Sequence, residues 1–133
     1  MVITSYDPKK VTVTLNGRVL TGFASDGIIT VSKSEDSFTP NVGAQGDVII
    51  EENANESGTI AVTLQQTSSS LPYLRNLAAN RTFFRTVISD SNDDDGIKIS
   101  ASNCRITKMP DVVRGKNTNT VTVNIYVPNL VIR

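Results

Sequence analysis

The fold is decided by residues 34–80, SEDSFTPNVGAQGDVIIEENANESGTIAVTLQQTSSSLPYLRNLAAN. This stretch opens with a long polar segment, passes through a short apolar run and an acidic turn into an alternating strand, and ends in a helix, Leu71–Ala79. The chain on either side consists of short alternating runs separated by turn residues, which is typical of strands. The sequence therefore predicts a mainly β fold: an antiparallel β-sandwich or barrel with one short flanking α-helix and a long inter-strand arm.

The polar segment Ser34–Asp47 is too long for a hairpin turn, and loops of this length without structure of their own are usually functional or disordered. Phe38 and Val42 argue against disorder, because a solvated linker seldom contains apolar anchors. Glycines in the segment allow sharp turns or the close approach of another chain. We predict an arm that contacts another subunit, with a flexible loop as the alternative. The candidate interface residues are Ser37, Phe38, Thr39, Pro40, Val42, Gly43 and Gly46.

After the arm, the pattern predicts a hairpin in which Val48–Glu52 pairs with Thr59–Gln65 around the turn Asn53–Gly58. The helix that follows has a choice of serine N-caps and a proline, Pro72, in its first turn, where the missing N–H is not needed. Because this helix is short, packing on the sheet must hold it. Asn80 is its expected end. The residues on its apolar face are Leu71, Leu74, Leu77 and Ala78.

The N-terminal part of the chain predicts a three-stranded meander. Residues 11–15, VTVTL, alternate, and Asn16–Gly17 is a strong hairpin signal because both residues tolerate positive φ. The partner strand is expected over Arg18–Phe23, and a third strand over Ile28–Lys33.

The C-terminal part predicts strands at Phe83–Ser89 and Thr120–Val127, with a longer strand between them. In that middle strand the apolar positions change parity between Ala101 and Cys104. A period-2 pattern changes parity only through an extra residue, so we predict a β-bulge near Ser102–Asn103. The single cysteine is in phase with the inward positions, which predicts a buried, reduced and unreactive thiol.

Several short motifs occur in an order and spacing that resemble the tail tube proteins of contractile-tailed phages, over nearly the whole length. The final strand departs from that pattern, because it has Val and Thr where an aromatic residue, often Trp, is expected. The motifs are Tyr6–Asp7–Pro8, Gly22–Phe23, Asp36–Ser37–Phe38, Val42–Gly43 with Gly46, Ser57–Gly58–Thr59–Ile60, Val62–Thr63–Leu64, Gln66–Thr67–Ser68, Cys104–Arg105–Ile106 and Pro110–Asp111.

The resemblance implies one tail-tube domain over residues 1–133 that joins copies of itself into hexameric rings, stacked into a hollow tube. It implies the tail sheath, the tape-measure protein and baseplate or tube-initiator proteins as partners, with DNA passing through without specific binding. The implied location is the virion tail, assembled in the host cytoplasm. The tube protein of type VI secretion systems shares this fold by resemblance and is one alternative.

DNA in such a tube must slide without sticking, and each basic side chain facing it would add a salt-dependent phosphate contact. We therefore expect a net negative or neutral lumen. The candidate lumen residues are Glu51, Glu52 and Glu56. A second acidic cluster is Asp90, Asp93, Asp94 and Asp95, for which a solvated turn on the outside is an equally good interpretation.

Composition excludes several function classes. At 133 residues with zero formal net charge, the chain lacks the basic surplus of a free nucleic-acid binder and is long enough for one core. The N-terminal residues lack the apolar core of a signal peptide, and no apolar run approaches the roughly 20 residues of a membrane span, so no membrane partner is expected.

The sequence predicts neither an enzyme nor a cofactor. With no histidine and one cysteine, the usual nucleophile pairs and zinc sites cannot be built. The segment Ser91–Gly96 resembles part of a calcium loop, but Ser91 and Ser102 occupy the positions that need Asp and Glu, so a solvated turn is the better interpretation. A monomeric or dimeric β-sandwich binding module stays open, although the absence of tryptophan argues against a sugar platform.

Overall fold

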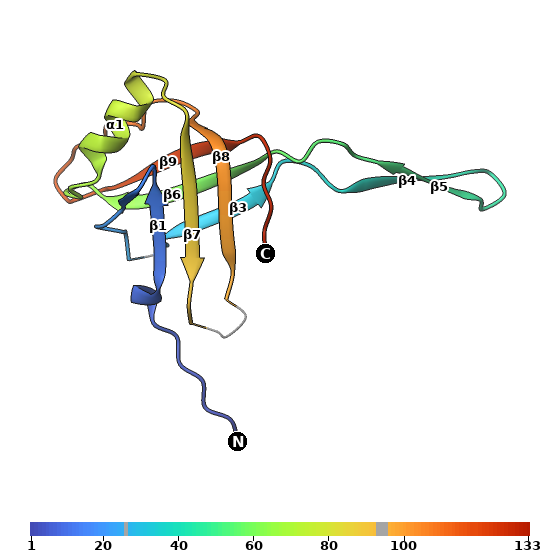
Figure 1. Ribbon diagram of the computed structural model, residues 1–133, viewed down its shortest axis with the longest axis horizontal. Coiled ribbons are helices and arrows are strands. Elements are labelled where there is room, and N and C mark those ends of the chain that lie inside the picture. The colour runs from blue at the N-terminus through green and yellow to red at the C-terminus, as the bar shows by residue number, and fades with distance from the viewer. Residues whose placement is uncertain (26, 93–95) are drawn as a thin grey trace.

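Strands dominate the computed structural model, in which residues 1–25, 27–92 and 96–133 are described (Figure 1). Over these residues, the predicted mainly β antiparallel fold with one α-helix and a long arm is confirmed. In chain order the elements are the 3₁₀ turn η1 (Pro8–Lys10), β1 (Val11–Leu15), β2 (Arg18–Val19), β3 (Ile29–Lys33), β4 (Phe38–Val42), β5 (Val48–Glu52), β6 (Gly58–Gln65), α1 (Leu71–Ala79), β7 (Phe84–Asp90), β8 (Lys98–Ile106) and β9 (Thr120–Val127).

The body of the molecule is one curved sheet with strand order β2-β1-β7-β8-β9-β6-β3. Figure 1 shows β1, β7 and β8 crossing β9, β6 and β3, so the two halves of the sheet form two layers. Strand β8 belongs to both halves, because its first part pairs with β7 and its last two residues, Arg105 and Ile106, pair with β9.

The predicted bulge is confirmed, and it lies where β8 passes from one layer to the other. The β7–β8 register gains one residue between the pairs Thr86↔Ala101 and Phe84↔Cys104, and Asn103 has a positive φ of 57°. A bulge bends its strand and increases the local twist, which is what a strand shared by two crossing layers requires.

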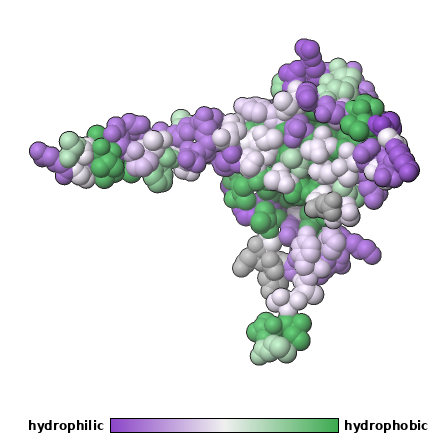
Figure 2. Space-filling model, turned by 180° about the vertical axis from the view of Figure 1, so that it is seen from behind, coloured by the Kyte–Doolittle hydropathy of each residue, from purple (hydrophilic) through white to green (hydrophobic). Residues whose placement is uncertain are grey.

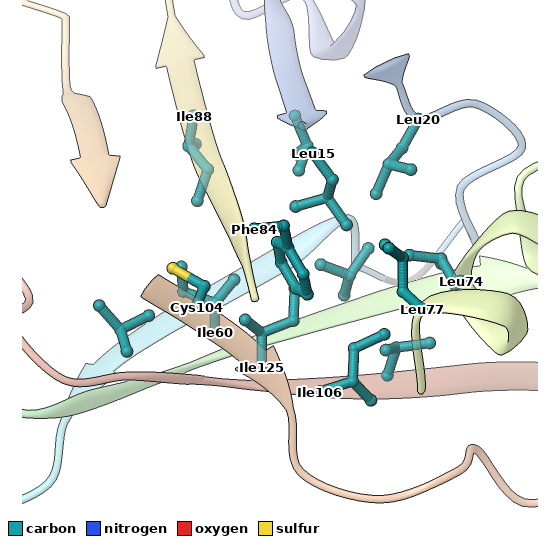
Figure 3. Close-up of a cluster of buried hydrophobic side chains, with 14 of the residues drawn as sticks. Leu15, Leu20, Ile60, Leu74, Leu77, Phe84, Ile88, Cys104, Ile106 and Ile125 are labelled. Atoms are coloured by element: carbon teal, nitrogen blue, oxygen red, sulfur yellow. The ribbon is translucent and has the colours of Figure 1, made fainter. Parts of the chain in front are cut away.

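The core lies between the two layers and under α1, where side chains from both converge (Figure 3). The helix has its predicted bounds and ends at Asn80, and its buried side chains are Leu71, Leu74 and Leu77. Ser70 occupies the N-cap without a capping bond from its side chain, because its hydroxyl accepts the backbone N–H of Thr21 at 3.0 Å instead. Fully buried residues from the layers include Val13, Leu15, Ile60, Val62, Leu64, Val123, Ile125, Val127 and Leu130.

The predicted hairpin of Val48–Glu52 with Thr59–Gln65 is wrong. Strand β5 pairs with β4, and β6 pairs with β3 and β9 instead. Two asparagine side chains turn the chain between β5 and β6: Asn53 Oδ1 accepts the N–H of Asn55, and Asn55 Oδ1 accepts that of Ser57, each at 3.0 Å. The polar stretch therefore returns the chain to the body and does not close a tight turn.

The predicted meander is also wrong beyond its first turn. The Asn16–Gly17 hairpin is present, but β2 ends at Val19, and β3 pairs with β6 across the molecule. Gly22 has φ of 77°, and a side chain there would collide with Ser68. The segment after β2 therefore leaves the extended conformation to pack beside the start of the helix.

Cys104 is fully buried, as predicted, and burial raises the pKa of its thiol. We expect a thiol reagent near neutral pH to leave the folded protein unlabelled and to modify one cysteine per chain after denaturation, because only the thiolate reacts and the reagent cannot reach it. Labelling of the native protein at the rate of a free cysteine would contradict this prediction.

Candidate subunit interface

Strands β4 and β5 form a two-stranded hairpin that projects from the body, and each pairs only with the other among the described residues (Figure 1). The predicted arm is thus a structured element with a strand over Phe38–Val42 and not a loop. A two-stranded hairpin alone is marginally stable in water. The extensive contacts of β4 and β5 are with each other and not with the body of their own subunit, so the arm is a candidate element for packing on another surface.

The two faces of the arm differ in chemistry. Cross-strand partners lie on the same face of a hairpin, so the register places Phe38, Pro40, Val42, Val48 and Ile50 together. We call these five residues the apolar arm face. Phe38 is 48% exposed and Val42 64%, and Figure 2 shows hydrophobic residues exposed along the arm. The opposite, polar arm face consists of Thr39, Asn41, Ile49 and Glu51. Exposed apolar strips are characteristic of interaction surfaces, so the apolar arm face is the candidate interface.

The glycines predicted to belong to the arm form its tip. Gly46 has φ of 91°, the Gly43 N–H donates to the Asp47 carbonyl at 2.7 Å, and the Gly46 N–H donates to the Gly43 carbonyl at 3.0 Å. At the root, the Ser37 carbonyl accepts the Asn53 N–H at 2.9 Å. The tip is therefore a tight turn that needs glycine at position 46.

The structure brings only part of the predicted interface together. Phe38, Pro40 and Val42 share one face, whereas Thr39 lies on the other. Sequence reasoning missed Val48 and Ile50, because it assigned them to a different hairpin. The run Val48–Ile50 has no alternation, so periodicity alone could not assign its members to a face.

The three candidate lumen glutamates do not form one cluster. Adjacent strand residues point to opposite faces, so Glu51 lies on the polar arm face and Glu52 on the other, beside Phe38. Glu56 lies at the root of the arm, where its carboxylate accepts a hydrogen bond from Lys33 Nζ at 2.7 Å. Of the three, Glu51 keeps the position most suited to an acidic lining, because Glu52 flanks apolar side chains and the charge of Glu56 is paired.

In the second acidic cluster, hydrogen bonds from the backbone and side chain of Asn92 lower the pKa of Asp90. Asp93, Asp94 and Asp95 lie outside the described residues, and they make up half of the calcium-like segment Ser91–Gly96. Within residues 1–25, 27–92 and 96–133, no group of three acidic, cysteine or histidine side chains is placed to hold a metal ion. None of the helical segments in these ranges is long and apolar enough to cross a membrane.

A further surface was not anticipated from the sequence. The outward positions of β3, β6 and β9 form a continuous face of uncharged side chains, with Thr63 and Thr122 hydroxyls 3.4 Å apart at its centre. The sequence does contain a pattern that could have predicted this face, because threonine and asparagine occupy the outward positions of the alternating strands. The residues of this uncharged sheet face are Thr30, Ser32, Thr59, Ala61, Thr63, Gln65, Thr120, Thr122 and Asn124.

Comparison with known proteins identifies this chain as similar to components of phage tail tubes. A family model described as "Bacteriophage PhiTE tail tube protein" matches residues 12–131. Among curated proteins, "Structural protein ORF10" of Pseudomonas phage KPP10 is 38% identical over 72 residues, which is 50% of this chain and 42% of that protein. The match therefore spans less than half the length of this relative.

Solved structures of contractile injection systems share the fold at low sequence identity. The sheath/tube terminator of the extracellular injection system PVC in its extended state has a TM-score of 0.65 at 12% identity, over 100% of this chain and 99% of that one. The cap that terminates the tube of the anti-feeding prophage has a TM-score of 0.61 at 11% identity, over 100% and 93%. A chain of the extended PVC sheath-tube complex has a TM-score of 0.60 at 9% identity, over 97% and 91%.

Proposed function

Because the chain belongs to the family of bacteriophage PhiTE tail tube proteins, we propose that it is the repeating subunit of a phage tail tube, a single domain that closes into hexameric rings stacked as a hollow conduit for DNA. The observation that carries this proposal is the projecting hairpin with an exposed apolar face, on a body whose own core is complete. The similarity to a structural protein of a phage favours a role in a phage tail over a role in a type VI secretion tube.

The arm is proposed to join one subunit to another. Its apolar face would be covered in the assembly, which removes exposed apolar surface from water at about 25 cal/mol per Å². A contact between an arm and a different surface of the next subunit is head-to-tail. Such contacts close into rings or repeat as an open filament, depending on the rotation between subunits, and a tube needs both kinds.

The lumen is proposed to be neutral or net negative, so that DNA passes without being held. The uncharged sheet face fits such a wall, since hydroxyl and amide groups offer no fixed charge to phosphates. Glu51 is the candidate acidic residue, with Glu52 and Glu56 as weaker ones. The proposed partners are further copies of the chain, the sheath, the tape-measure protein and the baseplate or initiator proteins, in the virion tail after assembly in the host cytoplasm.

Negative-stain electron microscopy of the purified protein at high concentration tests the proposed function. We expect rings or hollow tubes of uniform diameter. Small compact particles at every concentration, as a monomeric β-sandwich binding module would give, would contradict it.

A further inference from the structure

The zero net charge of the chain conceals a strong separation of charge. Residues 34–57, which comprise the arm and its root, contain six acidic side chains and no lysine or arginine. The remainder contains all 13 basic residues and seven acidic ones, so the arm carries a formal charge of −6 and the rest of the chain +6. Complementary charge on two parts of one chain steers copies of that chain toward each other.

Basic and apolar side chains meet in a groove on the body beside the helix. It has a volume of about 520 Å³ and lies between the end of α1 and the end of β8. Its lining includes Arg81, Arg105, Lys108, Met109 and Tyr126. Together with the adjacent Phe83, we call these residues the basic patch.

The side chains of the basic patch are exposed, except for the half-buried Arg105. Arg105 is the cross-strand partner of Tyr126, so both point outward, and its guanidinium lies 5.5 Å from the centre of the Phe83 ring. Phe83 is 62% exposed, which is unusual for a phenylalanine in a body with a complete core. Lys108 has an ion pair with Asp111 at 3.6 Å, but both side chains are largely exposed, so that pair contributes little.

We propose that the basic patch of one subunit receives the arm of a second copy. The apolar arm face would cover Phe83, Met109 and Tyr126, while the carboxylates of the arm would meet Arg105 and Lys108. Each surface supplies what the other lacks, since the arm has apolar and acidic side chains and the patch has apolar and basic ones. This inference rests on the proposed tube function and names the surface that the arm contacts.

Charge exchange between two variants tests the proposal. The arm variant is Asp36→Lys with Glu52→Lys, whose carboxylates accept no hydrogen bond from the described residues. The patch variant is Arg105→Glu with Lys108→Glu. Each variant alone places like charges at every arm–patch contact, so we expect at least about a tenfold loss of sedimentable tubes for either one.

Mixing the two variants should restore assembly. In an equimolar mixture, the reversed arm of the arm variant fits the reversed patch of the patch variant. The native arm of the patch variant fits the native patch of the arm variant. Tubes should therefore form and contain both proteins in equal amounts. The control replaces the same number of charges elsewhere, as Lys9→Glu with Lys10→Glu. That protein should form tubes alone. Because its patch is still basic, it offers no partner for the reversed arm and should not incorporate the arm variant in equal amounts.

The outcomes separate this inference from the function on which it depends. A patch variant that assembles alone as well as the wild type, or a mixture that stays unassembled, overturns the arm–patch contact and leaves the tube function standing. A wild-type protein that forms neither rings nor tubes overturns both. Circular dichroism of each variant, unchanged from the wild type, establishes that the loss is one of assembly.

Discussion

Replacing Phe38 with Lys is expected to abolish tube formation while leaving the β circular-dichroism spectrum intact. Phe38 is the one aromatic residue of the apolar arm face, and it lies outside the hydrophobic core of the body, so we expect the body to fold without it. An aromatic anchor at the centre of an interface contributes about 2 kcal/mol or more. Its loss should raise the concentration needed for assembly by about 30-fold, measured by sedimentation.

The neighbouring residue provides a matched control. Thr39→Lys adds the same charge one position along β4, but on the polar arm face. We expect this variant to assemble close to the wild-type concentration. If both variants assemble normally, the arm is not an inter-subunit element. If both fail equally, the assignment of the two faces is wrong.

Replacing Gly58 with Ala is expected to destabilise the folded subunit by about 1–3 kcal/mol in denaturant unfolding. Gly58 is the first residue of β6, where the arm rejoins the body, and it pairs with Lys33 and Val127. A Cβ there would collide with the Leu130 side chain and would lie 2.7 Å from the Ser32 carbonyl oxygen. Backbone cannot yield as a flexible side chain does, so the strands at the root of the arm would have to separate.

The same substitution at Gly115 is the control, because a Cβ there meets only Asn119 at 3.9 Å. Gly115→Ala should leave stability within about 0.5 kcal/mol of the wild type. A second comparison uses Leu130→Ala, which removes the colliding side chain. The double variant should lose less than the sum of the two single losses, since the residues are in contact. If the two losses of stability add fully, the contact with Leu130 is not the reason why alanine at position 58 destabilises the subunit.

The sequence predicts well those elements whose limits are set by neighbouring residues. The helix was placed from its leucine spacing and Pro72, the strand Thr120–Val127 from its alternation, and the bulge from a change of parity. In each case the pattern is contained within about ten residues. The phage tail tube family was also identified from the order of short motifs, and the family match confirms it.

Strand partners were harder to predict, because pairing is decided by the whole fold. Val48–Glu52 can pair with the strand before it or the strand after it, and neither periodicity nor turn chemistry decides between the two choices. The structure chooses β4 because β6 is already held on both sides by β3 and β9. The two faces of the arm could be assigned only once this register was known. The charge separation was visible in the composition of residues 34–57, but its meaning depended on knowing that they project from the body.

A three-dimensional reconstruction of assembled tubes by electron cryo-microscopy would show directly whether the arm joins subunits. We expect each β4–β5 hairpin to lie against a neighbouring subunit with Phe38, Val42 and Ile50 covered. We also expect a lumen wall without a majority of lysine and arginine side chains. Tubes in which the hairpin projects into solvent, with its apolar face uncovered, would show that the arm does not join subunits.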